Sequence, residues 1–78
     1  MLARGGFVIR KMREMRGYTQ QRLSVEYGVH KNTMSKWETG AIEPSFLTVF
    51  EIGRYLHFDI MNIYQMVNDI SKEKQKAA

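Results

Sequence analysis

Glycines and a single proline divide this 78-residue chain into segments of about the length of an ordinary helix. The dividing residues are Gly5, Gly6, Gly17, Gly28, Gly40 and Pro44. Within the segments, apolar residues recur at steps of three and four positions, and there is little of the two-residue alternation that is typical of strands. The sequence therefore predicts an all-α fold built from five short helices.

The first three helices are delimited by their expected caps. A helix over residues 7–16 is followed by a second one, which Thr19 caps and Gly28 ends. A third begins near His30 and ends before Gly40. The apolar side chains expected to turn inward from the first two helices are Val8, Met12, Met15, Leu23 and Tyr27.

The fourth and fifth helices carry the longest apolar stripes. Pro44 and Ser45 are suited to start the fourth helix, and Asp59 is suited to cap the fifth. The stripe of the fourth helix is Phe46, Val49, Ile52, Gly53 and Leu56, and that of the fifth is Ile60, Ile63, Tyr64, Val67 and Ile70. We expect one domain over residues 1–70 and a charged, disordered tail over residues 71–78.

Composition excludes several kinds of protein. The chain has no cysteine and only two histidines, so neither disulfides nor a zinc site of the usual ligands can support its small core. No apolar run reaches the roughly 20 residues of a membrane span, and no signal peptide is visible. We therefore expect a cytoplasmic protein, without metal, cofactor or membrane partner and with no evident small-molecule effector.

Positive charge is concentrated in the first half of the chain. Residues 1–40 hold eight basic and three acidic residues, whereas residues 41–78 hold four and five. This asymmetry favours a surface that meets a polyanion, but an excess of lysine and arginine can also serve solubility alone. Composition by itself leaves both interpretations open.

The stretch "GVHKNTMSKWETG", residues 28–40, is mostly polar and lies between two glycines. At about 100° per residue, Met34 and Trp37 share a narrow anchoring stripe. The opposite face is polar and positive, and holds Lys31, Asn32, Ser35, Lys36 and Thr39. Asparagine, lysine, serine and threonine are side chains that hydrogen-bond to base edges, and a glycine-containing turn joins this helix to the one before it.

With these residues in view, the chain resembles the Cro and phage-repressor type of helix-turn-helix family, also called the xenobiotic-response-element type. The matching run is "IRKMREMRGYTQQRLSVEYGVHKNTMSKWETGAIEPS", and the resemblance extends to about Tyr64. It implies a five-helix, lambda-repressor-like domain in which the second and third helices form the helix-turn-helix. It also implies a transcriptional regulator, with repression the favoured role, that binds operator DNA as a homodimer. A protein of this family is expected to have a bacterial or phage origin.

The resemblance assigns roles to individual positions. The residues expected to contact bases are Lys31, Asn32 and Lys36, with Thr33 and His30 at the margin. The residues expected to contact the DNA backbone are Gln20, Thr19, Thr39 and Ser35. Arg13 and Glu38 match a family ion pair that joins the first helix to the end of the third.

Two positions depart from the family pattern. His30 stands where serine is common, so it is either a weaker helix cap or a phosphate contact. Glu43 lies in a loop that is often basic, and we expect it to bring an acid to the DNA side. A phosphate clamp from that loop is therefore not predicted.

Surplus apolar residues in the second half predict a symmetric dimer. The expected interface is Leu47, Phe50, Ile60, Tyr64 and Val67. The alternative is a protein-interaction module, such as an antitoxin or anti-repressor, that grips its partner with the same apolar half. No arrangement of nucleophile, base and orienting group is visible, so the sequence does not predict an enzyme.

Overall fold

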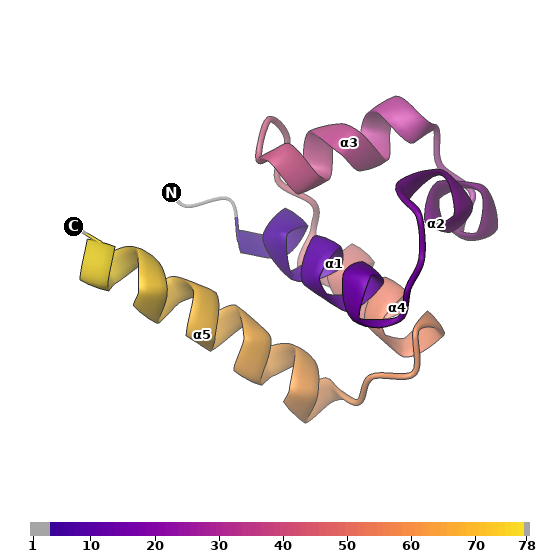
Figure 1. Ribbon diagram of the computed structural model, residues 1–78. Helices are drawn as coiled ribbons and strands as arrows, with labels where there is room; N and C mark the ends of the chain where they lie inside the picture. The colour runs from indigo at the N-terminus through magenta and orange to yellow at the C-terminus, as the bar shows by residue number, and fades with distance from the viewer. Residues whose placement is uncertain (1–3, 78) are drawn as a thin grey trace.

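The computed structural model describes the backbone of residues 4–77 and the side chains of residues 5–69. Its secondary structure consists of five helices, and the described residues include no strand (Figure 1). The helices are α1 (Arg4–Met15), α2 (Gln20–Tyr27), α3 (Lys31–Thr39), α4 (Phe46–Tyr55) and α5 (Ile60–Ala77). The predicted all-α fold is therefore confirmed.

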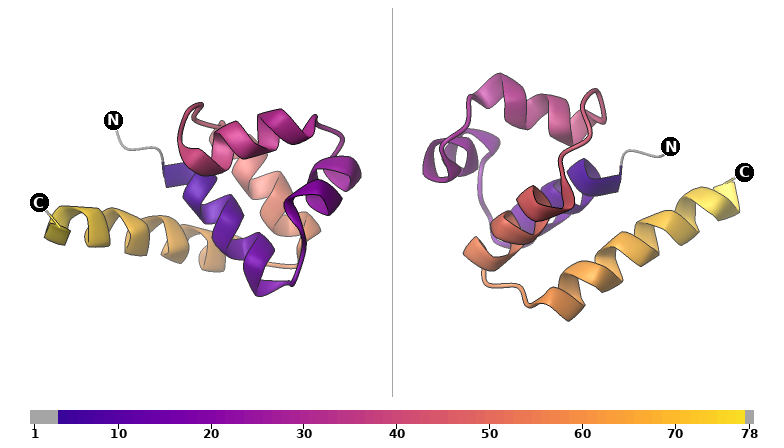
Figure 2. Two further views of the ribbon diagram at one scale, coloured as in Figure 1. Left: turned by 45° about the horizontal axis from the view of Figure 1, so that its top comes forward. Right: turned by 180° about the vertical axis from the view of Figure 1, so that it is seen from behind.

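Helix α1 lies at the centre of the fold and packs against α3, α4 and α5. In the views of Figures 1 and 2, α3 crosses on one side of α1 and α5 runs along the other. Helix α2 packs mainly against α3. The helix-turn-helix unit therefore sits on a scaffold made by the other three helices.

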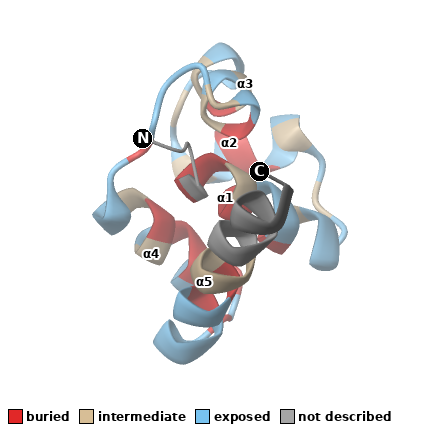
Figure 3. Ribbon diagram, turned by 90° about the vertical axis from the view of Figure 1, so that its left-hand side faces the viewer, coloured by how far each residue is buried: buried red, intermediate tan, exposed pale blue. Residues whose placement is uncertain are grey.

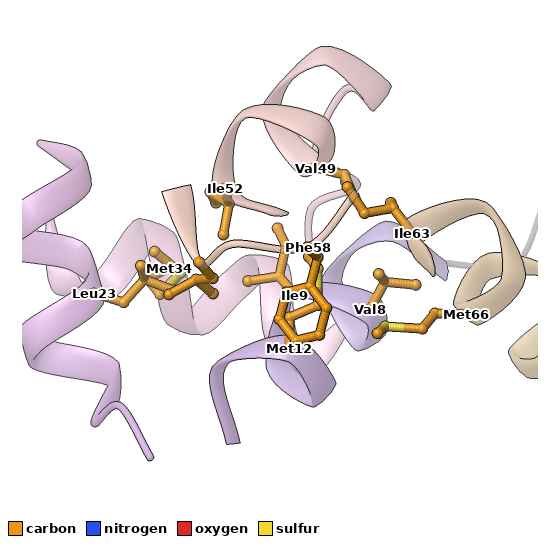
Figure 4. Packing of buried hydrophobic residues seen from close by; sticks show 11 residues of the cluster. Val8, Ile9, Met12, Leu23, Met34, Val49, Ile52, Phe58, Ile63 and Met66 are labelled. Carbon is orange, nitrogen blue, oxygen red and sulfur yellow. The ribbon is translucent and has the colours of Figure 1, made fainter. Parts of the chain in front are cut away.

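One cluster of apolar side chains joins all five helices. Leu23 and Met34, both with 0% of their surface exposed, lie at one end of the cluster, and Val8 and Met66 lie at the other (Figure 4). Figure 3 shows the buried positions of α1, α4 and α5 turned toward one another. The members of the cluster are Val8, Ile9, Met12, Leu23, Met34, Val49, Ile52, Leu56, Phe58, Ile63 and Met66.

Side chains cap the helices where the sequence predicts. The Thr19 and Ser45 hydroxyl oxygens accept hydrogen bonds from the backbone N–H groups of Arg22 and Thr48, at 3.0 and 3.1 Å. The Asp59 carboxylate accepts one from Asn62 at 2.7 Å. Each bond satisfies a donor that has no partner within its own helix.

In α1 and α4, two residues of the predicted apolar stripes are exposed instead. Met15 is 56% exposed and Phe46 is 66% exposed. The inward face of α1 consists of Val8, Ile9 and Met12, so Met15 lies off that face. Phe46 occupies the first turn of α4, where it stacks with Phe50 at 6.4 Å between ring centroids.

The inward face of α5 also differs from the predicted stripe. Ile63 and Met66 are buried and Val67 is partly buried, whereas Ile60 and Tyr64 are 61% and 55% exposed. The side chain of Ile70 lies outside the described residues. The backbone of α5 is helical as far as Ala77, so the helix continues into residues 71–77, for which a disordered tail is predicted.

Candidate nucleic-acid interface

A tight turn sets the angle between α2 and α3. Gly28 ends α2 with a φ of 95°, which is accessible to glycine at little cost. The backbone N–H groups of Gly28 and Val29 both donate to the carbonyl oxygen of Ser24, at 2.9 and 3.0 Å. The turn is therefore closed by the end of α2 itself, and three residues, 28–30, separate α2 from α3.

Helix α3 is anchored by one face and leaves the other free. Met34 is fully buried, and the Trp37 ring packs edge-on against Tyr27 with ring centroids 6.4 Å apart. Of the polar residues, Lys31, Asn32, Lys36 and Thr39 are exposed, while Thr33 and Ser35 are half-buried. This set, residues 31–33, 35, 36 and 39, is the polar face of α3.

The polar face of α3 presents positive charge without a compensating acid. Glu38 is the only acidic residue of α3, and its side chain is 3% exposed. Neither Lys31 nor Lys36 forms an ion pair within the described part of the chain. A face of this kind suits a polyanion, because its two ammonium groups are free to bind phosphate or base acceptors.

His30 caps α3. Its Nδ1 atom accepts a hydrogen bond of 3.0 Å from the backbone N–H of Asn32. A neutral imidazole that accepts at Nδ1 carries its proton at Nε2, so the ring keeps one donor for a second partner. His30 is predicted to be either a helix cap or a phosphate contact, and the structure shows it as a cap.

Arg13 and Glu38, for which an ion pair is predicted, are joined by two hydrogen bonds. Arg13 Nε donates to Glu38 Oε2 and Arg13 Nη2 donates to Oε1, each at 2.9 Å. The side chains are 13% and 3% exposed. The hydrogen bond to Glu38 raises the pKa of Arg13, whose Nη1 also donates to the Tyr18 carbonyl at 2.8 Å. The pair links α1 to the end of α3 and to the segment that precedes α2.

Gln20 belongs to the same network. Its Nε2 atom donates to Glu38 Oε1 at 3.2 Å. A side-chain amide nitrogen carries two hydrogens, so one N–H remains after this bond. Glu38 thus orients the residue at the start of α2 for which a phosphate contact is predicted.

The two threonines predicted to contact the DNA backbone also form local hydrogen bonds. The Thr19 hydroxyl accepts from the backbone of Arg22 and retains its own proton for donation. The Thr39 hydroxyl donates to the Lys36 carbonyl at 3.3 Å, so its proton is used within α3. Thr19 is the better placed of the two to donate to a phosphate.

Glu43 binds the N-terminus of α1. Its carboxylate accepts a hydrogen bond of 3.1 Å from the backbone N–H of Gly5, in the first turn of α1. The free N–H groups of a helix N-terminus attract a carboxylate, which explains this placement. Glu43 thus uses one carboxylate oxygen within the fold, and the acid expected on the DNA side stays a prediction.

Two hydrogen bonds between tyrosine and glutamate tie α2 to α4. The Tyr27 hydroxyl donates to Glu51 at 2.7 Å, and the Tyr55 hydroxyl donates to Glu26. We call these two bonds the tyrosine clasp. Sequence reasoning missed it, because its partners lie 24 and 29 residues apart and no local spacing connects them.

The clasp makes stability depend on pH at alkaline values. The hydrogen bond to Glu26 raises the pKa of Tyr55 from 10.0 to about 12. The pKa of Tyr55 is higher in the folded chain than in the unfolded one. The stabilisation that its hydrogen bond to Glu26 provides is therefore complete below pH 10 and is lost as the pH rises toward 12. In an ultraviolet titration of the tyrosines, we expect a late ionisation step that Tyr55→Phe removes.

Glu26→Gln provides the control for this titration. It keeps Tyr55 but replaces the carboxylate that accepts its proton, so the late step should move back toward pH 10. A late step that is unchanged in both variants would show that the hydrogen bond between Tyr55 and Glu26 does not form.

The described residues contain neither a cluster of metal ligands nor a helix suited to span a membrane. In the part of the chain that the structure describes, no three metal-ligating side chains of histidine, cysteine, aspartate or glutamate come together. No helix among these residues is both long and apolar enough to cross a membrane.

Comparison with known proteins adds one result to this geometry. A family model described as helix-turn-helix matches residues 9–60, which are 52 of the 78 residues and include α2, the turn and α3 entire. No curated protein matches the chain, and no solved structure matches it. The family match covers the residues that form the polar face and its supporting network. The chain therefore belongs to the helix-turn-helix family of DNA-binding regulators of the Cro and phage-repressor type.

Proposed function

We propose that this protein is a sequence-specific repressor that inserts the N-terminal end of α3 into the major groove of operator DNA. The observation that carries this proposal is the polar face of α3, which has two unpaired lysines and whose helix has only a buried acid. Bound near a promoter, such a protein can repress transcription by competing with polymerase or activate it by recruiting polymerase, and repression is the role proposed here. Membership of a DNA-binding family supports the DNA-binding part of this proposal.

Base contacts are assigned to side chains at the start and centre of the polar face. Lys31, Asn32 and Lys36 are exposed, and their chemistry suits base edges: lysine donates to guanine, and asparagine forms two hydrogen bonds with adenine. Thr33 and His30 lie at the margin. The free Nε2 donor of His30 suits either a phosphate or a base acceptor.

Backbone contacts are assigned to residues around the start of α2 and along α3. Gln20 retains one amide N–H, and Thr19 retains its hydroxyl proton, so both can donate to a phosphate. Ser35 and Thr39 complete the assignment from α3. These contacts position the protein without reading sequence.

We further propose that the protein acts as a symmetric dimer. Leu47, Ile60 and Tyr64 are 68%, 61% and 55% exposed, which leaves apolar surface for a partner. Phe50 and Val67, the other residues of the expected interface, are partly buried. A dimer sets two copies of α3 into successive major grooves about 34 Å apart on an operator with two-fold symmetry.

The exposed apolar surface also favours a second function, that of a protein-interaction module. Salt separates the two functions, because DNA binding releases counterions and an apolar protein contact does not. With a labelled duplex of random sequence, we expect affinity to fall steeply as salt rises. Binding that is absent, or that does not depend on salt, would favour the interaction module.

Two substitutions separate base reading from backbone contact. Asn32→Ala should weaken the free energy of binding to the preferred site by about 1 to 3 kcal/mol and relax the preference for a particular base at one base pair. Gln20→Ala should weaken binding to all sequences alike, since it removes a phosphate donor. Competition binding with the preferred duplex and its single-base variants measures both. An equal loss on every duplex for Asn32→Ala would contradict the base-reading role.

A further inference from the structure

The cap of α3 differs in chemistry from the caps of α2, α4 and α5. Thr19, Ser45 and Asp59 cap those helices with oxygen atoms. His30 caps α3 with a ring nitrogen, Nδ1, which accepts the backbone N–H of Asn32 at 3.0 Å. Histidine is the side chain that ordinarily gains or loses its charge between about pH 5 and pH 8. The start of α3 is therefore held by an acceptor that can take up a proton close to neutral pH.

The cap of α3 requires a neutral ring. A protonated imidazole carries a hydrogen on both nitrogens, so Nδ1 can no longer accept and the N–H of Asn32 loses its partner. The charged ring then lies at the N-terminus of α3, where the partial positive charge of the helix repels a cation. Because both effects act on the same turn, protonation of His30 destabilises the first turn of α3.

No acid among the described residues offsets the charge of a protonated ring. The exposed charges of α3 are Lys31 and Lys36, and its acid, Glu38, is paired with Arg13. The helices that pack most extensively on α3 are α1 and α2, and each described acid on them is paired with an arginine of its own helix. The titratable and charged side chains described on these two helices are Arg10, Lys11, Arg13, Glu14, Arg22, Glu26 and Tyr27. His30 forms no ion pair with any of the described acids.

The first turn of α3 carries side chains that are assigned to base reading. Lys31, Asn32 and Thr33 follow the cap directly. These side chains read base edges only when the turn holds them in place, whereas attraction to phosphate depends mainly on charge. A protonated ring adds a charge that attracts the phosphates of every duplex, and it loosens the turn that distinguishes one duplex from another. Protonation of His30 therefore acts differently on specific and non-specific binding.

We propose that His30 is a specificity-determining residue that makes the discrimination between DNA sequences depend on pH. With a neutral ring, the cap holds the start of α3 in the geometry that reads bases. With a protonated ring, the protein still binds DNA but distinguishes its operator less well from other sequences. This inference rests on the DNA-reading role proposed for α3, and it adds a condition under which that role operates.

The ratio of two dissociation constants measures this discrimination. One is the constant for a duplex of random sequence and the other is the constant for the preferred duplex, both at a fixed ionic strength because salt changes each of them. Attraction of the ring to phosphate is common to both complexes and cancels in the ratio. For the wild-type chain, we expect the ratio to fall about fivefold or more between about pH 7.5 and about pH 5.5.

His30→Ser is the matched variant, because serine is a good helix cap that does not titrate in this range. Its ratio should stay within about twofold over the same pH interval. His57→Asn is the control, since His57 is the other histidine of the chain and is exposed. Its φ of 67° lies in the left-handed region, which asparagine adopts more readily than most residues. His57→Asn should show the same fall in the ratio as the wild-type chain.

A measurement without DNA separates the cap from the function that depends on it. In NMR spectra of the free wild-type chain, we expect the amide resonance of Asn32 to shift as the pH falls through the range in which discrimination is lost. In His30→Ser this shift should be absent, because the serine hydroxyl accepts the same N–H at both pH values. A pH-dependent shift that persists in His30→Ser would contradict the role of Nδ1 in the cap.

The DNA measurements distinguish this inference from the wider proposal. A wild-type ratio that does not change with pH, or that falls equally in His30→Ser, would overturn the role of His30 and leave α3 as the helix that reads DNA. A wild-type chain that does not distinguish the two duplexes at any pH would overturn both, even if the amide resonance of Asn32 titrates. A fall in the ratio that occurs only in proteins with His30 supports the inference.

Discussion

Gly6→Ala is expected to lower the free energy of unfolding by about 3 kcal/mol or more. A Cβ atom at Gly6 would lie 1.5 Å from the carbonyl oxygen of Trp37 and 2.4 Å from its carbonyl carbon. Both are backbone atoms of α3, so no side chain can rotate away to relieve the overlap. The intrinsic helix preference for alanine, about 1 kcal/mol, is too small to compensate.

Gly17→Ala provides the matched control for this substitution. Gly17 has no atom within 4 Å of an added Cβ, and its φ of 72° imposes only the strain of a left-handed residue. That strain costs about 1 to 2 kcal/mol. Chemical denaturation measures both variants. If Gly6→Ala is no less stable than Gly17→Ala, then α1 and α3 do not approach as closely as the structure indicates.

Glu38→Gln is expected to cost about 3 kcal/mol of stability. The substitution keeps the shape of the side chain but leaves the Arg13 guanidinium without its carboxylate, in a site where the arginine side chain is 13% exposed. A largely buried charge without a partner has lost its hydration and gains no Coulombic attraction to offset that loss. Glu14→Gln, which breaks the exposed pair with Arg10, should cost about 0.5 kcal/mol or less.

Replacing both members of the buried pair should recover most of the loss. In Arg13→Met/Glu38→Leu no charge is left unpaired, so we expect a coupling energy of about 2 kcal/mol in a double-mutant cycle. Chemical denaturation of the wild-type chain, the two single variants and the double variant gives the free energies of unfolding from which this coupling energy is calculated. A cycle with no coupling would mean that Arg13 and Glu38 act independently.

Sequence alone predicted the features that depend on neighbours along the chain. The caps at Thr19, Ser45 and Asp59 form with residues only three positions away, so each is visible as a local pattern. The same holds for Gly28, which ends α2 and opens the turn. These local signals, together with apolar periodicity, were enough for five helices and an all-α fold.

Features that depend on contacts between distant segments were not predicted. Glu43 binds the N-terminus of α1 across 38 residues, and Tyr55 binds Glu26 across 29. Met15 is a further example. It belongs to a periodic apolar stripe in the sequence, but in the structure the inward face of α1 includes Ile9 and leaves Met15 exposed. Periodicity identifies an apolar face, but neighbouring helices decide which edge of it is covered.

For the candidate site, the sequence predicted side-chain types better than hydrogen-bond geometry. The polar face of α3 follows from helical spacing, and Asn32 and Lys36 are exposed in the structure. The spacing could not show that Gln20 donates to Glu38, or that His30 uses Nδ1 for the cap. Both details depend on where side chains meet in three dimensions.

Selection from a pool of random duplex DNA, run in parallel with the wild-type chain and Asn32→Ala, tests the DNA-reading role of α3 most directly. We expect the wild-type chain to enrich a motif with two-fold symmetry and half-sites about 34 Å apart. Asn32→Ala should keep that spacing and lose preference at one base pair of each half-site. Identical motifs from the two proteins, or no enrichment by the wild-type chain, would contradict the assignment of α3 as the helix that reads DNA.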